Sequence, residues 1–129
     1  MKRLLFACLL PVLFWGCKKT DTTLSPIEVQ VNGLVASNAR LNLQAIDVTQ
    51  NNAGILSVIN RDGDAIYSTA IVYPGDQINI TYGAAATAAQ PGDNQATITY
   101  YYKGQKIGVT SGSLSYPGTL STTIYVPAQ

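Results

Sequence analysis

The chain has 129 residues, only 12% of them charged, and a formal net charge of +1. This length corresponds to one domain. A near-neutral chain without a Lys/Arg cluster argues against nucleic-acid binding, which requires several convergent cations. The chain contains no His, so the commonest general base and metal ligand is missing and the Ser-His and Cys-His catalytic arrangements are excluded. We predict no metal site and no cofactor.

The N-terminus has the organisation of an export signal. Lys2 and Arg3 precede a mostly apolar run of twelve residues, Leu4 to Trp15. As a helix this run would be about 18 Å long, well short of the roughly 30 Å hydrocarbon core of a bilayer. A basic start followed by a short apolar run is typical of a cleaved signal and not of a membrane span. We predict that residues 1–16 are a signal peptide.

The apolar run ends in Gly16-Cys17. This pair resembles the lipobox of bacterial lipoproteins, in which a small residue precedes the cysteine that receives the lipid. The resemblance implies cleavage between Gly16 and Cys17 and fatty-acyl chains such as palmitate on Cys17. Cys8 also follows a lipobox-like segment, but that reading leaves only four apolar residues before it, too few for a signal. We therefore predict that Cys17 is the lipidated residue.

The residues that follow Cys17 suggest a compartment. Cys17-Lys18-Lys19-Thr20-Asp21 resembles the start of mature lipoproteins from the Bacteroidetes group, and Lys18 at the second mature position implies the outer membrane. Surface-export signals in that group carry several acidic residues, whereas Asp21 stands alone, so the side of the membrane stays open. Residues 17–25 are predicted to be the lipidated cysteine and a polar tether. The eight residues from Lys18 reach at most about 28 Å.

Residues 26–129 are predicted to be one β domain, because apolar and polar residues alternate with period two in several runs. The clearest are Ile27–Asn32, Gln77–Tyr82 and Gln95–Tyr102. Five less regular runs are Leu41–Val48, Ile55–Asn60, Ile66–Val72, Lys106–Thr110 and Leu120–Val126. About eight short strands separated by Gly, Pro, Asn and Asp turns indicate an all-β, antiparallel two-layer β-sandwich.

An immunoglobulin-like Greek key is favoured over a closed barrel. Val72–Ile80 also resembles the turn and strand entry of bacterial immunoglobulin-like domains. In the run Leu41–Val48, the apolar residues change from odd-numbered to even-numbered positions after Ala45. This change predicts a bulge near Ala45, since one inserted residue moves the following side chains to the other face of the strand. The Ala/Thr stretch 83–89 is predicted to be a loop, with an edge strand as the alternative.

The acidic residues suggest little chemistry. Asp62-Gly63-Asp64, with Asn60 before it, could offer three oxygens to calcium, which needs six to eight. We favour a hairpin turn for these residues. Five of the seven acidic residues after the signal lie in or beside turn signals or the tether, and none shows the apolar surroundings that a catalytic acid requires. We do not expect an enzyme.

Tyrosine offers the best candidate for a ligand face. Tyr101 and Tyr125 fall on the polar side of their strands by alternation, and exposed tyrosines can stack on sugar rings, although tyrosine is also an ordinary strand residue. Their predicted polar neighbours are Gln95, Thr97 and Thr99. Two functions follow from this reading. The leading one is a lipid-anchored, non-enzymatic interaction or structural module that meets an envelope protein through a strand edge or face; the alternative is a carbohydrate-binding module.

Overall fold

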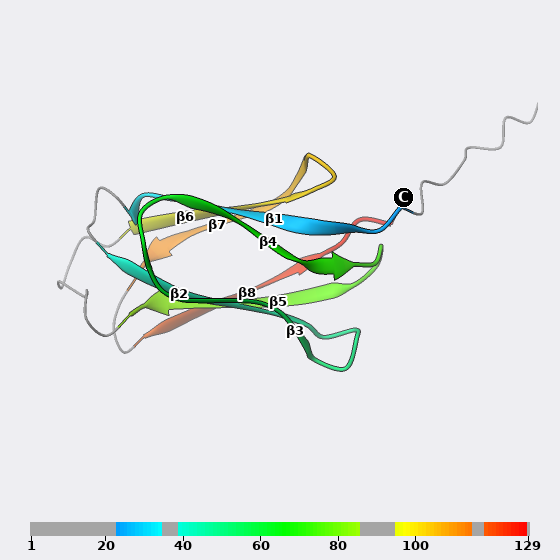
Figure 1. The fold of residues 1–129 in the computed structure, drawn as a ribbon, viewed down its shortest axis with the longest axis horizontal. Helices are drawn as coiled ribbons and strands as arrows, with labels where there is room; N and C mark the ends of the chain where they lie inside the picture. Colours follow the sequence, from blue (N-terminus) through cyan, green and yellow to red (C-terminus); the bar gives the residue numbers. More distant parts are fainter. Residues whose placement is uncertain (1–22, 35–38, 86–94, 115–117, 129) are drawn as a thin grey trace, which may run out of the picture.

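The computed structural model describes residues 23–34, 39–85, 95–114 and 118–128, and these form an all-β sandwich (Figure 1). The signal, Cys17 and most of the tether lie outside the described residues. The strands are β1 (Ser25–Asn32), β2 (Arg40–Asp47), β3 (Ala53–Asp62), β4 (Ala65–Val72), β5 (Gln77–Ala84), β6 (Gln95–Tyr102), β7 (Gln105–Ser113) and β8 (Thr119–Tyr125). They build two antiparallel four-stranded sheets, β4-β1-β6-β7 and β3-β2-β5-β8. The predicted fold class is confirmed.

Two of the connections are hairpins within a sheet, and both use residues with positive φ. Lys103 and Gly104, at φ 50° and 75°, join β6 to β7, and Asn51 and Asn52, at φ 56° and 59°, lie in the turn between β2 and β3. Two successive residues with positive φ match the right-handed twist of the flanking strands. The turn type therefore explains why these strand pairs are neighbours in space.

The immunoglobulin-like strand order is not confirmed. An immunoglobulin sandwich places its third, sixth and seventh strands in one sheet, whereas here β3 lies in the sheet opposite β6 and β7. The hairpin predicted at residues 62–64 is also wrong, because β3 and β4 belong to different sheets and this turn crosses between them. Turn residues specify a local change of direction, but not the strand with which the chain then pairs.

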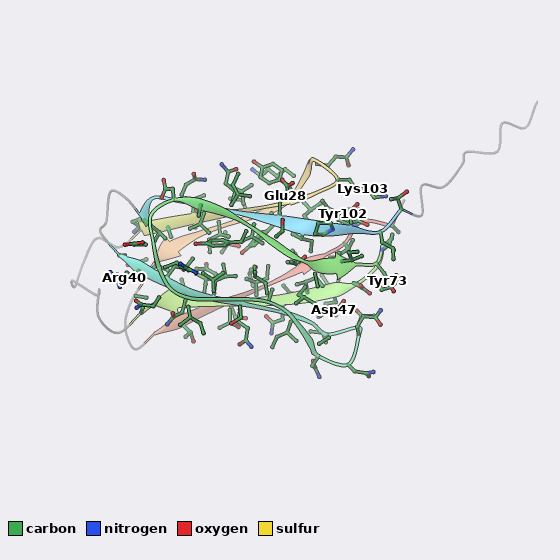
Figure 2. All side chains as sticks on the ribbon, viewed as in Figure 1. Glu28, Arg40, Asp47, Tyr73, Tyr102 and Lys103 are labelled. Atoms are coloured by element: carbon green, nitrogen blue, oxygen red, sulfur yellow. The ribbon has the colours of Figure 1, made fainter. Side chains whose placement is uncertain are left out.

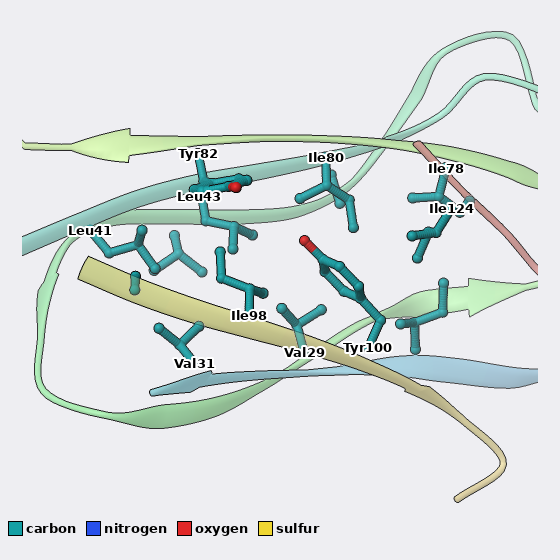
Figure 3. Close-up of a cluster of buried hydrophobic side chains, with 14 of the residues drawn as sticks. Val29, Val31, Leu41, Leu43, Ile78, Ile80, Tyr82, Ile98, Tyr100 and Ile124 are labelled. Carbon is teal, nitrogen blue, oxygen red and sulfur yellow. The ribbon is translucent and has the colours of Figure 1, made fainter. Parts of the chain in front are cut away.

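The core lies between the two sheets and is built from alternate residues of each strand (Figure 3). Val29 and Val31 of β1 and Ile98 of β6 face Leu43 of β2 and Ile80 of β5, and all five side chains are buried. Burying such a side chain contributes about 1.5–3 kcal/mol relative to leaving it in water. The period-two pattern in the sequence is therefore the pattern of inward-facing side chains.

The bulge predicted at Ala45 has a different structure from the one expected. The β2–β3 register does shift between Ala45 and Ile46, but the extra residue is Ile55 of β3, and the pairing of β2 with β5 is continuous. Strand β2 keeps its phase, so Ile46 is half-buried and Asp47 is only 2% exposed. The predicted loop also begins too early, because β5 continues to Ala84; residues 86–89 lie outside the described part of the chain.

The two ends of the sandwich differ in the chain segments that they hold. One end of the sandwich holds the start of β1 and the C-terminus of the chain. The β4–β5 turn at Tyr73 and the β6–β7 turn at Lys103 lie at the same end (Figures 1 and 2). Arg40 marks the opposite end, where β2 starts (Figure 2). A tether that enters at β1 therefore joins one end of the sandwich, and the Arg40 end lies farthest from it.

Two tyrosine hydroxyls lie in the interior. The Oη atoms of Tyr100 and Tyr102 are buried and have no hydrogen-bond partner among the described residues. Figure 3 shows the Tyr100 ring pointing across the core toward β5. Burial raises the pKa of Tyr100 from 10.0 to about 12, since a buried site disfavours the phenolate. The nearby Thr110 side chain lowers the pKa by less, and it does not meet hydrogen-bond geometry with the Tyr100 hydroxyl. A buried, unpaired hydroxyl is unfavourable for folding by about 1–3 kcal/mol.

We expect Tyr100→Phe to raise the free energy of unfolding by about 1 kcal/mol, because it removes the unpaired hydroxyl and keeps the ring. Urea unfolding followed by circular dichroism measures the change. The gain should grow between pH 10 and 12, where the wild type loses stability because unfolding frees Tyr100 to ionise. Tyr101→Phe is the control, because its half-exposed ring meets water. A loss of stability in Tyr100→Phe would show that the hydroxyl has a partner.

Candidate functional site

Four of the five residues predicted for a ligand face lie together on the outer side of β6. Gln95 is exposed, Thr97 and Tyr101 are half-buried, and Thr99 is only 8% exposed. The Thr97 hydroxyl lies 3.1 Å from the Ser111 hydroxyl on β7. Tyr101 pairs with Glu28 on one side and Lys106 on the other. This face therefore surrounds its one tyrosine with charged neighbours.

Tyr125 lies elsewhere. It ends β8, an edge strand of the opposite sheet, where it pairs with Gln77 and is 65% exposed. Tyr101 belongs to the β4-β1-β6-β7 sheet, so the two tyrosines point out of opposite sides of the sandwich. The five residues do not form one ligand face. Alternation assigns a residue to the polar side of its strand, but strand order decides which of the two outer surfaces that side becomes.

The acidic residues of the β3–β4 turn have separate structural partners. The Asp64 carboxylate accepts a hydrogen bond of 2.9 Å from the Leu34 N–H, and Asp62 lies 3.9 Å from Arg40. In the part of the chain that the structure describes, no group of three or more His, Cys, Asp or Glu side chains could hold a metal ion. These contacts agree with a structural role for Asp62 and Asp64 in the turn.

Asp47 and Asp76 are the only two acidic side chains among the described residues that are buried, each 2% exposed. The Gln50 backbone N–H donates to Asp47 at 3.0 Å and the Gln50 side-chain amide donates to Asp76 at 3.1 Å. Asp76 also accepts a 2.7 Å bond from the Tyr73 N–H. Burial first, and then the neighbouring Asp76 carboxyl, raises the pKa of Asp47. The pair thus ties together two turns at the end where β1 begins.

A groove on the outer face of the β3-β2-β5-β8 sheet is the strongest candidate for a binding site. It has a volume of about 400 Å³, within the range of about 300–1,000 Å³ typical of small-molecule sites. Its outward-facing side chains come from four strands. They are Asn42 and Gln44 of β2, Ser57 and Ile59 of β3, Thr81 of β5 and Thr119 of β8.

The floor of the groove is shaped by close backbone contacts. A Cβ atom at Gly83 would lie 2.7 Å from the Gly118 carbonyl oxygen, so only glycine allows β8 to approach β5 here. Gln44 and Thr81 are direct neighbours across the β2–β5 ladder. The side-chain Oδ1 of Asn42 accepts a 2.8 Å hydrogen bond from the Asn60 backbone N–H. That bond fixes the amide and leaves its N–H groups to donate to a ligand.

The groove is uncharged. None of its lining residues is Lys, Arg, Asp or Glu, and the polar groups are amides and hydroxyls, which both donate and accept hydrogen bonds. Ile59 is 72% exposed and adds an apolar wall. Such a site suits an uncharged ligand with many hydroxyl groups. This groove was not predicted from the sequence, because it joins four strands that are distant along the chain. The alternating polar residues Asn42 and Gln44 are the sign of it that the sequence contains.

Comparison of the chain with protein-family models, with curated proteins and with solved structures finds no match. Among the described residues, no helix is long and apolar enough to cross a membrane.

We expect Asp47→Asn to stabilise the protein at neutral pH by about 1 kcal/mol, because Asn keeps the acceptor for Gln50, can donate to Asp76 and carries no buried charge. The pKa of Asp47 is raised in the folded state above its ordinary 3.8, so its stabilising effect is complete below that value and is lost as pH rises through the raised pKa. The difference between variant and wild type should therefore shrink as pH falls toward 4.

Thermal unfolding at several pH values measures this difference. Asp62→Asn is the matched control, since Asp62 is exposed and its partner Arg40 is 3.9 Å away. An Asp47→Asn variant less stable than the wild type at pH 7 would contradict the argument.

Proposed function

We propose that this protein is a non-enzymatic cell-envelope lipoprotein whose β-sandwich acts as an interaction or structural module. The observation that carries the proposal is the order of the chain: a basic start, a short apolar run and Gly16-Cys17, followed by strands that begin only at Ser25. The described strands begin at Ser25, after the tether that the sequence predicts.

Lipid on Cys17 would hold the domain firmly at the outer membrane. Each buried methylene contributes about 0.8 kcal/mol, and a single acyl chain binds only reversibly, so two or more chains are needed. Removal of Lys2 and Arg3 with the signal leaves six basic and seven acidic residues. The processed chain therefore carries no net positive charge with which to bind anionic lipid, and the acyl chains would be its attachment.

The contacts of the buried carboxyls also support a non-catalytic role. Asp47 and Asp76 accept hydrogen bonds from backbone and amide groups of the turns around them, and neither lines the groove on the outer face. A general acid must instead reach the substrate from a shared site. The groove itself offers amides and hydroxyls for contact with a partner.

Replacement of Cys17 tests the anchor. We expect the wild type, expressed in a Gram-negative host, to incorporate labelled palmitate and to enter the detergent phase on Triton X-114 partitioning. Cys17→Ser should incorporate no label and stay in the aqueous phase or keep its signal, because serine lacks the acylated sulfur. Cys8→Ser is the matched control and should behave like the wild type. Labelled Cys17→Ser, or loss of label in Cys8→Ser, would overturn the assignment.

A further inference from the structure

We propose that the groove on the outer face of the β3-β2-β5-β8 sheet binds a neutral oligosaccharide. This inference rests on the proposed function, since it names the ligand class of the anchored module. Four observations support this proposal: the lining is uncharged, its side chains are amides and hydroxyls, its floor lies on two inner strands, and it lies far from the predicted tether.

The lining selects against charged ligands. No Lys, Arg, Asp or Glu side chain lines the groove, and burial raises the pKa of the one ionisable lining residue, Tyr82, so that it is neutral at neutral pH. Arg40 and Asp62, at the same end of the sandwich, lie 3.9 Å from one another. An anionic or cationic group placed in the groove would lose water without gaining an opposite charge. An uncharged ligand avoids that loss.

The side chains match sugar hydroxyls. Gln44 and Thr81 lie side by side on the two central strands, and Asn42, Ser57 and Thr119 surround them. Each of these groups can donate and accept, as each sugar hydroxyl does. The exposed Ile59 supplies an apolar surface for the C–H face of a pyranose ring. The groove spans residues of all four strands, an extent that suits linked rings better than a single sugar.

The backbone of the floor argues against a peptide. β2 pairs with both β3 and β5, and β5 pairs with both β2 and β8. The β2–β5 and β5–β8 ladders are continuous, whereas the β2–β3 register shifts beside Asn42, where Ile59 and Asn60 both lie opposite that residue. Because β2 and β5 are inner strands with a partner on each side, an extended peptide lying over them finds no strand edge to extend. Recognition in the groove must come from side chains, which suits a sugar with hydroxyls on every carbon.

The groove also lies at the accessible end of the molecule. Asn42 is two residues from Arg40 at the start of β2, and Gly83 is near the end of β5, so the groove is near the Arg40 end and away from the start of β1 (Figure 2). A lipid on Cys17, tethered through β1, would therefore hold the groove away from the membrane. Long glycans could then reach it without meeting the head groups.

A glycan array that carries neutral and acidic oligosaccharides tests the inference with the full chain in detergent micelles. We expect the wild type to bind neutral members, and Gln44→Ala with Thr81→Ala to weaken binding by about tenfold through loss of two hydrogen-bonding groups. The control is Gln30→Ala with Ser68→Ala, which removes one amide and one hydroxyl from β1 and β4 of the other sheet. It should bind as the wild type does.

Ser57→Trp is a second variant, which fills the groove from the exposed edge strand β3 and should also abolish binding. Circular dichroism and thermal melting confirm that each variant is folded. Absence of binding to every neutral oligosaccharide, preference for acidic ones, or an equal loss in the control would overturn the inference. Palmitate labelling of the same preparation separates the two proposals. A protein that incorporates palmitate but binds no glycan would contradict only the proposal that the groove binds oligosaccharide. A protein that binds glycan but incorporates no palmitate would contradict only the lipidation of Cys17.

Discussion

The packing of two antiparallel sheets face to face is the constraint on which the rest of this structure depends. Each strand has to present one apolar side to the opposite sheet, so its residues alternate between interior and surface. The central pairs, β1 with β6 and β2 with β5, supply much of the buried core, including Val29, Ile98, Leu43 and Ile80. The outer sides of these same strands are then left to contact solvent and partners.

The same alternation places some polar groups in the interior, because every second residue of a strand faces inward whether it is apolar or polar. β2 does so at Asp47, whose carboxyl accepts a hydrogen bond from the Gln50 N–H of the following turn. β6 does so at Tyr100 and Tyr102, whose hydroxyls are buried without described partners. The whole strand decides which of its residues face inward. A single polar residue is therefore buried by its position in the strand and not by its own hydrophobicity.

The two outer faces of the sandwich differ in chemistry. The β4-β1-β6-β7 face holds Glu28, Lys106 and Tyr101, whereas the groove on the other face is lined by amides, hydroxyls and Ile59. The glycine at position 83 allows the Gly118 carbonyl, just before β8, to lie close to β5 at this groove. A lipid anchor before β1 would attach the domain at the end of the strands opposite to the groove.

The sequence by itself determined the strands, their inward-facing residues and the two-layer architecture, because period-two alternation is a local property of each strand. Gly, Pro, Asn and Asp residues also indicated turns between the strands, and two of these turns contain positive φ, at Lys103-Gly104 and at Asn51-Asn52. Only the tertiary structure decided which strands are neighbours. That choice moved Tyr125 away from Tyr101, made the turn at residues 62–64 a crossing between sheets, and assembled the groove from four strands. Strand order depends on long-range pairing, and no local pattern of residues records it.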